Sequence, residues 1–224
     1  MTAAQLPEGA SLRTHRAAQF VGRTVVRLPY RVRVHRPERV PSAGPVVLVA
    51  NHSSLLDGPL LFGALRRPAV FLIKQELFRG PVGWILRRIG QLGVRRGVPD
   101  RAPLLAAVRL LRDGGLVGVF PEGTRGDGDL ADAQHGAAWL ARSAKAKVLP
   151  VVCRGTRRPV GGRRRVLPRV DVLFGEPVEL SGDKGRAGLE QATQQVRAEL
   201  VELIAELDRQ IADRGNDYWR GKRA

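Results

Sequence analysis

A histidine and an aspartate, His52 and Asp57, stand five positions apart in the stretch ANHSSLLDG (residues 50–58). Neighbours on a regular helix are three or four residues apart, so this spacing needs a turn to bring the two side chains together. The carboxylate could then hydrogen-bond one imidazole nitrogen and leave the other as a base for a hydroxyl proton. The same residues would also suit a turn whose polar side chains only cap the following helix. The local pattern fits both interpretations equally.

The elements around this turn predict where it lies. An apolar run (46–49) leads into it and a helical stretch (59–65) leads away, which is typical of a buried strand, a turn and a helix. Further apolar runs at 69–73, 91–94 and 116–120 are followed directly by Lys74, by Arg95 and Arg96, and by Glu122 and Arg125. Strands that alternate with helices favour an α/β fold with a mainly parallel central sheet, in which ligands gather beyond the carboxyl ends of the strands. We therefore expect one pocket with a base, its carboxylate and several cations.

The rest of the chain extends this α/β layer at both ends. We expect a single domain organised as an N-terminal segment (1–36), a central α/β domain (37–180) and a C-terminal helix with a basic tail (181–224). Further helices are predicted at 80–88, 103–112, 131–143 and 189–214, and further strands at 31–36, 148–153 and 170–174. His35 is expected to be solvent-exposed, Trp84 to lie in the core or an interface, and Leu200, Ile204, Leu207 and Ile211 to form the docking face of the last helix.

The composition limits the classes of partner. The 224 residues carry a formal net charge of +17 and are 43% hydrophobic, which suits a folded domain attracted to a polyanion. Nucleic acid, an anionic membrane surface and phosphorylated substrates all qualify. The single cysteine, Cys153, excludes an intramolecular disulfide framework and a cysteine-rich metal site. No apolar run is long enough to be a secretory signal or a membrane span.

The predicted helix at 11–28 is basic and amphipathic. Arg16, Arg23 and Arg27 share one stripe, and the opposite stripe holds Ala18, Val21, Val25 and Leu28. Such a helix could bind a membrane surface, or it could pack its apolar stripe on the domain and turn its arginines to water. Both interpretations remain open at this point.

Four blocks in this order resemble the glycerolipid acyltransferases, the family of the 1-acylglycerol-3-phosphate acyltransferases. NHSSLLDG (51–58) is similar to the family's His-x4-Asp block, and FPEGTRG (120–126) to its FPEGTR block. Between them, KQEL (74–77) and VRR (94–96) resemble an intermediate block, and VLPV (148–151) resembles a fourth. The resemblance covers roughly residues 37–177.

The resemblance implies a role for each matching residue. His52 would be the general base and Asp57 its orienting partner. Lys74, Arg96 and Arg125 would bind the acceptor's phosphate, while Glu122, Gly123 and Thr124 would shape the glycerol site. The acyl chain would pass from acyl-CoA or acyl carrier protein to the free hydroxyl of 1-acylglycerol 3-phosphate, without a metal or redox cofactor. The partners would be these substrates and an anionic membrane surface, on the cytoplasmic side of the cell membrane and without a spanning helix. Because the substrates are amphipathic and arginine is in surplus, we expect peripheral attachment with residues 11–28 as the chief contact.

One departure and two alternatives qualify this interpretation. Family members commonly carry an aromatic-Lys pair shortly after FPEGTR, whereas this chain has AQHG at 133–136, so the acceptor could be held differently. Glycerol 3-phosphate or another lysophospholipid is an alternative acceptor. An alternative of a different class is a basic nucleic-acid-binding module using the arginine-rich stretch 157–165, although its aromatic content of 5% is low for base stacking.

Overall fold

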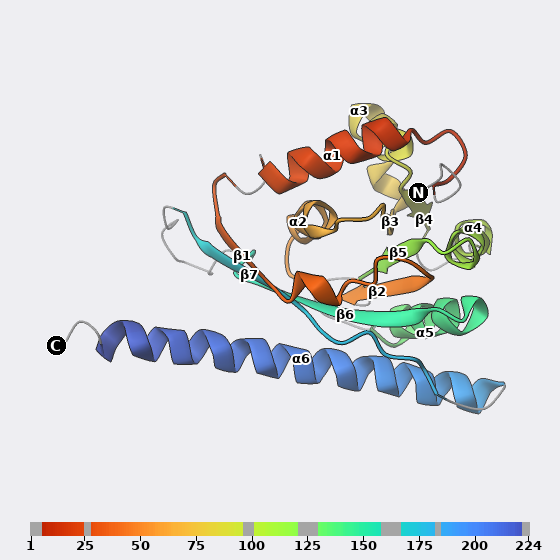
Figure 1. Cartoon of the computed structure of the whole chain (residues 1–224). Coiled ribbons are helices and arrows are strands. Elements are labelled where there is room, and N and C mark those ends of the chain that lie inside the picture. The colour runs from red at the N-terminus through yellow and green to blue at the C-terminus, as the bar shows by residue number, and fades with distance from the viewer. Residues whose placement is uncertain are drawn as a thin grey trace.

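The computed structural model contains one seven-stranded sheet with helices on both faces (Figure 1). It describes residues 6–24, 28–95, 101–120, 130–157, 167–181 and 185–220, without the side chains of 130–134 and 215–220. The strands are β1 (Arg31–His35), β2 (Val46–Ala50), β3 (Val70–Lys74), β4 (Leu92–Val94), β5 (Leu116–Val119), β6 (Lys147–Arg154) and β7 (Arg169–Phe174). The helices are α1 (Leu12–Thr24), α2 (Asp57–Ala64), α3 (Gly80–Arg88), α4 (Arg101–Arg112), α5 (Leu130–Ala144) and α6 (Arg186–Arg220), with short 3-10 helices η2 (Pro37–Arg39) and η3 (Gln75–Leu77).

The sheet is mainly parallel, which confirms the expected fold class. Its strand order is β1-β7-β6-β2-β5-β3-β4. β6, β2, β5, β3 and β4 all run in the same direction, and only the β6–β7 pairing is antiparallel. The five parallel strands therefore end at one edge of the sheet, with β2 between β6 and β5.

The core forms because successive side chains of β2 point to opposite faces of the sheet. Val47 and Val49 pack with residues of α4 and α5, while Val46, Leu48 and Ala50 pack with α2. Every residue of β2 is buried, as expected for the central strand of a sheet covered on both faces. The turn that follows β2 is thus held on a rigid support.

Helix α1 packs through polar side chains, so the interpretation in which its apolar stripe packs on the domain is wrong. The buried residues of α1 are His15, Gln19 and Gly22, whereas Phe20 and Val21 are exposed. His15 Nδ1 lies 2.7 Å from the Ile89 carbonyl oxygen, and Gln19 donates to the carbonyl oxygens of Phe62 and Arg67. Buried polar groups are stable only when they are paired, and here carbonyls at the ends of other elements supply the partners. The helix ends at Thr24, and residues 25–27 lie outside the described residues.

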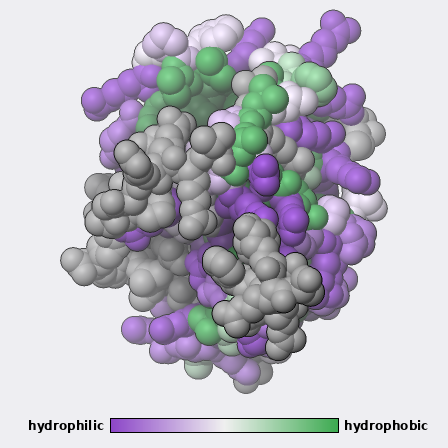
Figure 2. All heavy atoms as spheres, turned by 90° about the vertical axis from the view of Figure 1, so that its left-hand side faces the viewer, coloured by the Kyte–Doolittle hydropathy of each residue, from purple (hydrophilic) through white to green (hydrophobic). Residues whose placement is uncertain are grey.

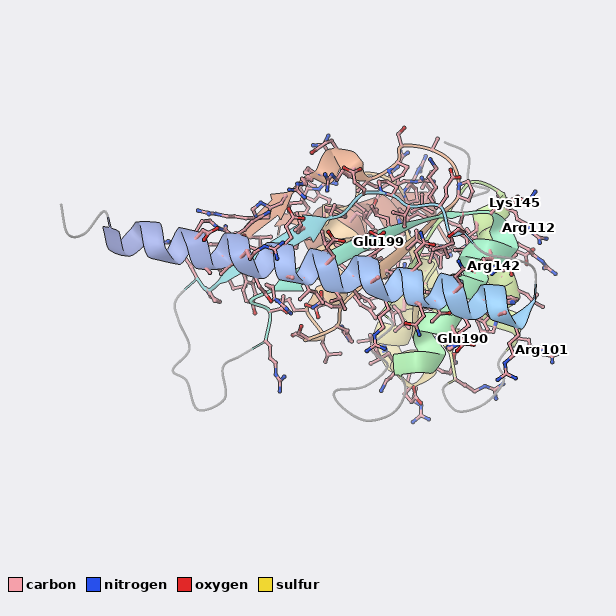
Figure 3. The ribbon with its side chains drawn as sticks, turned by 90° about the horizontal axis from the view of Figure 1, so that it is seen from below. Arg101, Arg112, Arg142, Lys145, Glu190 and Glu199 are labelled. Atoms are coloured by element: carbon pink, nitrogen blue, oxygen red, sulfur yellow. The ribbon has the colours of Figure 1, made fainter. Side chains whose placement is uncertain are left out.

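Helix α6 lies across the opposite side of the domain and runs along the length of the sheet (Figures 1 and 3). Its docking residues are Leu200, Leu203 and Leu207, which form an apolar cluster with β6 and β7, so Leu203 replaces Ile211 in the expected face. Three ion pairs add to this contact: Arg36–Glu206, Arg154–Asp208 and Arg214–Asp171.

One single-residue expectation is wrong and another is narrowed. His35 is not simply solvent-exposed, because its Nε2 lies 2.8 Å from Oδ1 of Asp171, which also accepts from Arg214. Trp84 lies outside the core, since 61% of it is exposed, so an interface is the remaining part of its prediction.

At the other end of the domain, Arg112 donates to the Ser143 carbonyl and joins the ends of α4 and α5, near the start of α6 in Figure 3.

Candidate functional site

His52 and Asp57 meet in the turn between β2 and α2. His52 Nδ1 lies 3.2 Å from Asp57 Oδ2, and the same oxygen accepts the backbone N–H groups of Ser53 and Ser54 at 2.7 and 2.8 Å. Asp57 is the first residue of α2 and is completely buried, while 29% of the His52 side chain is exposed. The turn bends back so that its own amides bind the carboxylate, and this accounts for the spacing of five. Asp57 binds amides of the turn and also the imidazole, which is the geometry that the first interpretation requires. The role of His52 as a base stays a prediction.

The partners of Asp57 determine which imidazole nitrogen is basic. Oδ2 can only accept, so Nδ1 of His52 donates its N–H and Nε2 carries the lone pair. The helix N-terminus and two amide donors stabilise the buried negative charge of Asp57. Its second oxygen, Oδ1, is buried with no hydrogen-bond partner among the described residues. A base with a fixed tautomer next to a buried carboxylate is suited to removing a proton from an alcohol.

Asn51 fixes this turn to the neighbouring strand β6. Its Oδ1 accepts the Cys153 N–H at 2.7 Å, and its Nδ2 donates to the Cys153 carbonyl at 3.0 Å. The side chain thus replaces backbone pairing at the point where β2 has already ended. Burial raises the pKa of the Cys153 thiol well above its ordinary value, and the nearby charge of Asp57 adds to this effect. Cys153 is therefore a protonated structural residue and is not suited to carry an acyl group.

An aromatic row supports the other side of His52. The Phe120 ring lies 4.6 Å from the imidazole, centroid to centroid, and stacks on Phe71 at 5.7 Å. Gly118 makes this row possible, because a Cβ there would lie 2.4 Å from the ring of Phe71. The sequence predicts Phe120 only as part of a motif, and its contact with His52 was not expected. Alternation along β5 and the residue that follows it, with Gly118 and Phe120 on one face, is the signal that could have indicated this contact.

Of the positively charged residues predicted for the site, those that the structure describes lie at the same edge of the sheet. Lys74 ends β3 and Arg95 follows β4. β5 lies between β2 and β3, so Lys74 is two strand spacings from the turn, about 10 Å. Arg96, Glu122, Gly123, Thr124 and Arg125 lie outside the described residues, as do the side chains of Ala133 and Gln134. The structure thus brings together His52 and Asp57 and places Lys74 on the β5 side of them.

Comparison with known proteins places these residues in a family context. The family model described as Acyltransferase matches residues 31–154, which includes the whole turn. The 1-acyl-sn-glycerol-3-phosphate acyltransferase beta of Homo sapiens is 39% identical over 127 residues, 54% of this chain and 46% of the human protein. The 1-acyl-sn-glycerol-3-phosphate acyltransferase of Bacillus subtilis is 29% identical over 150 residues, 66% of this chain and 73% of that protein. The match thus spans less than half the length of the human relative.

A solved structure is similar over a larger part of the chain. It is the crystal structure of the 1-acyl-sn-glycerophosphate (LPA) acyltransferase PlsC from Thermotoga maritima, with a TM-score of 0.65 and 28% sequence identity. The superposition covers 85% of this chain and 80% of the other.

Proposed function

The chain belongs to the acyltransferase family, and we propose that it transfers a fatty acyl chain from a thioester donor to the free hydroxyl of 1-acylglycerol 3-phosphate, giving phosphatidic acid. The observation that carries this proposal is the His52–Asp57 pair at 3.2 Å, placed by the turn after β2. The names of the relatives support the acceptor, and the donor is proposed to be acyl-CoA or acyl carrier protein.

The pair supports a direct transfer in which His52 is the general base. Nε2 takes the proton of the acceptor hydroxyl as its oxygen attacks the thioester carbonyl carbon, and Asp57 stabilises the imidazolium that forms. A new C–O bond forms, the C–S bond breaks, and the proton passes from His52 to the departing thiolate. The products are an ester and a free thiol. Because Cys153 stays a buried thiol, this scheme contains no acyl-enzyme on cysteine.

The acceptor's phosphate would be bound on the β5 side of His52. Lys74 is placed there at the end of β3, and we propose that Arg96 and Arg125 contribute the remaining positive charges. Glu122, Gly123 and Thr124 are proposed to shape the glycerol site. Arginine is suited to this role because its planar guanidinium makes two parallel hydrogen bonds to a phosphate.

A substrate panel tests the reaction and the choice of acceptor together. The purified chain is incubated with palmitoyl-CoA and, separately, 1-acylglycerol 3-phosphate, glycerol 3-phosphate, 1-acylglycerophosphocholine and 1-monoacylglycerol, and the products are identified by mass spectrometry. We expect phosphatidic acid from the first acceptor and much slower turnover of the phosphate-free monoacylglycerol. Equal turnover of monoacylglycerol would remove the proposed role of the cations. Ester formation on none of the acceptors, also with an acyl carrier protein donor, would remove the proposed activity.

We further propose that α1 and α3 form one face that binds an anionic membrane surface peripherally. This membrane face carries exposed apolar side chains beside arginines and has no acidic residue in either helix: Phe20, Val21, Val82, Trp84 and Ile85 with Arg13, Arg16, Arg87 and Arg88. Figure 2 shows apolar surface interrupted by hydrophilic side chains over the uppermost helices of Figure 1. The backbone N–H of Ser11 donates to the Arg88 carbonyl, so the two helices are fixed to each other. Among the described residues, no helix is long and apolar enough to cross a bilayer.

A further inference from the structure

A pocket of about 590 Å³ lies on the side of the catalytic turn away from Phe120 and Lys74. Its lining comes from the turn and start of α2 and from the segments that precede β1 and follow β6: Tyr30, Ser53, Ser54, Leu55, Leu56, Pro59, Thr156 and Arg157. The volume is within the range of small-molecule sites, about 300–1,000 Å³. Ser53 adjoins His52, so one end of the pocket lies next to the proposed base.

One wall of this pocket contains an unsatisfied polar group. Only 7% of Thr156 is exposed, and its Oγ1 is buried without a hydrogen-bond partner among the described residues. A buried hydroxyl without a partner is unfavourable, and in a pocket wall a ligand can supply the missing hydrogen bond. Arg157, the next residue, is exposed and brings a positive charge to the opening.

The backbone holds these two residues in place relative to His52. Gly155 turns the chain after β6 with a φ of 86°, and a Cβ there would lie 2.1 Å from the Arg169 carbonyl oxygen. Only glycine fits this turn without displacing β7. Asn51 binds both backbone groups of Cys153, three residues before Thr156, so the pocket wall and the catalytic turn form one unit.

The lining combines apolar and polar surface, which suits an elongated ligand that carries both apolar and polar groups. Leu55, Leu56 and Pro59 offer apolar contacts, while Thr156 and Arg157 offer a hydroxyl and a cation. The proposed function puts the acceptor's phosphate on the β5 side of His52, so the thioester must approach from another direction. The β6 side is open to it, because the pocket lies there.

We infer that this pocket binds the 4′-phosphopantetheine arm of the acyl donor. This inference rests on the proposed function. The arm carries the thioester sulfur at one end, amides and a dimethyl-substituted carbon along its length, and a phosphate at the other. The sulfur lies beside His52, the chain lies against Leu55 and Pro59, an amide or hydroxyl of the arm pairs with Thr156 Oγ1, and the phosphate reaches Arg157. Coenzyme A and acyl carrier protein share this arm, so the pocket would recognise either donor by the same group.

Steady-state kinetics on three variants test this assignment: T156V, R157A, and R109A as the control. Arg109 is an exposed arginine on α4, so R109A removes the same charge from a remote surface. T156V removes the hydroxyl at nearly constant shape, and the loss of an unpaired hydroxyl does not destabilise the fold. We expect R157A to raise the KM for palmitoyl-CoA by about tenfold, the loss of one charge-assisted hydrogen bond. T156V should raise it by about threefold to tenfold, and R109A should leave it unchanged.

Donor analogues distinguish the arm from its alternatives. The KM for palmitoyl carrier protein should increase in the same variants. An N-acetylcysteamine palmitoyl thioester lacks the phosphate and most of the arm, so its KM should be the same for wild type and R157A. The KM for 1-acylglycerol 3-phosphate should not change. An increase confined to the acceptor, or one that persists with the truncated thioester, would overturn the inference. So would an increase with palmitoyl-CoA alone, because the pocket would then recognise the nucleotide.

Direct binding separates this inference from the proposed function. Isothermal titration of the wild-type protein with free coenzyme A should give binding that R157A weakens about tenfold and R109A leaves unchanged. If the wild-type protein binds coenzyme A in this way but forms no ester, the proposed function is contradicted and the assignment of the pocket stands. If ester is formed but R157A changes neither coenzyme A binding nor the donor KM, the proposed function stands and the assignment of the pocket is contradicted.

Discussion

Asp57 is the residue on which the chemistry of the turn depends, because one of its oxygens serves three donors. Oδ2 binds the imidazole of His52 and two backbone amides, so the carboxylate holds the shape of the turn and the tautomer of the base together. A substitution can therefore affect the reaction, the local fold, or both. Two substitutions separate these roles.

Replacing the imidazole should abolish turnover and preserve the fold. His52 is the one imidazole in the turn sequence, and general-base catalysis typically supplies about 100- to 10,000-fold. We expect H52A to lower kcat for phosphatidate formation by that factor, because 29% of the His52 side chain is exposed and its removal leaves no sealed cavity. The measurement is initial rate with palmitoyl-CoA, with thermal unfolding as the control for folding. Substantial activity in a folded H52A protein would contradict the general-base scheme.

Asp57→Asn tests the charge of the carboxylate. The amide oxygen can take the place of Oδ2 and accept from Ser53, Ser54 and Nδ1 of His52, so the turn and the tautomer of the imidazole are kept. The negative charge that stabilises the imidazolium is lost. We expect D57N to lose about 10²- to 10⁴-fold in kcat with little change in acceptor KM, and an effect mainly on acceptor KM would contradict this role of Asp57.

The residues of the turn could be predicted from the sequence because their determinants are local. A fully apolar run before the turn is typical of a buried parallel strand, and this fixes the edge at which His52 lies. Thr156 and Asn51 could not be assigned in the same way. The importance of Asn51 comes from Cys153, about a hundred positions away, and that of Thr156 comes from its place in the wall of a pocket that distant segments form. No periodicity within one segment contains that information.

At the scale of elements, the decisive contact is between α1 and α2, whose backbones approach at two glycines. A Cβ on Gly63 would lie 2.4 Å from the backbone carbon of Gly22, and one on Gly22 would lie 2.9 Å from the Pro59 carbonyl oxygen. The sequence predicts a helix near residues 11–28, and of its two interpretations the packing of the apolar stripe on the domain is wrong. Amphipathicity assumes that the buried face is apolar, and here it consists of small and polar residues whose partners are distant carbonyls.

Gly63→Ala should loosen α1 from the domain. The added methyl group has no space between the two backbones, and overpacking of this kind typically costs about 1–3 kcal/mol. The matched control is G136A on α5, where a Cβ meets nothing within 4 Å and alanine should stabilise the helix by about 0.5–1 kcal/mol. Chemical denaturation of both variants checks the opposite signs. A G63A protein as stable as wild type would show that the close contact is dispensable.

His15 should make the docking of α1 sensitive to acid. Its Nδ1–H donates to Ile89 O and its Nε2 accepts from the Ala69 N–H, an arrangement that only the neutral imidazole can form. Burial lowers the pKa of His15 below its ordinary value of 6.5. Below that pH the unfolded chain takes up a proton that the folded protein does not, so the free energy of unfolding falls as the pH decreases.

The variant H15Q should remove this component. Its Tm should be lower than that of wild type at pH 8, but the two curves should converge as the pH is lowered from about 6.5 towards 5. The hydrogen bond from Arg36 lowers the pKa of Glu206 below its ordinary value of 4.5. The contribution of Glu206 to the free energy of unfolding is therefore lost only below about pH 4.5 and does not affect the comparison. Thermal unfolding at half-unit pH steps is the measurement. Parallel curves for the two proteins between pH 8 and 5 would contradict the assignment.

At the scale of the whole molecule, the two sides of the sheet have different roles. On one side α6 packs its leucines on β6 and β7 and forms ion pairs with both strands, beside α4 and α5 (Figure 3). The other side presents α1 and α3, with apolar and arginine side chains outward and no acidic residue in either helix. The net charge of +17 already indicated a polyanionic partner. Only the packing of α1 through its polar face shows why its apolar residues are exposed.

The membrane face should bind anionic vesicles through apolar and ionic contacts together. Each arginine near an anionic surface contributes about 1 kcal/mol, and this term is screened by salt, whereas buried apolar side chains contribute independently of salt. We expect the double variant F20A/I85A to bind phosphatidylglycerol-containing vesicles more weakly at both low and high salt, and R13A/R16A to lose binding mainly at low salt. V201A on α6, which changes an exposed apolar residue on the opposite side, is the control. Vesicle co-sedimentation at 50 and 500 mM NaCl makes the comparison, with zwitterionic vesicles as a second reference. Equal losses in V201A and F20A/I85A, or binding that is indifferent to all of these substitutions, would place the membrane contact elsewhere on the molecule.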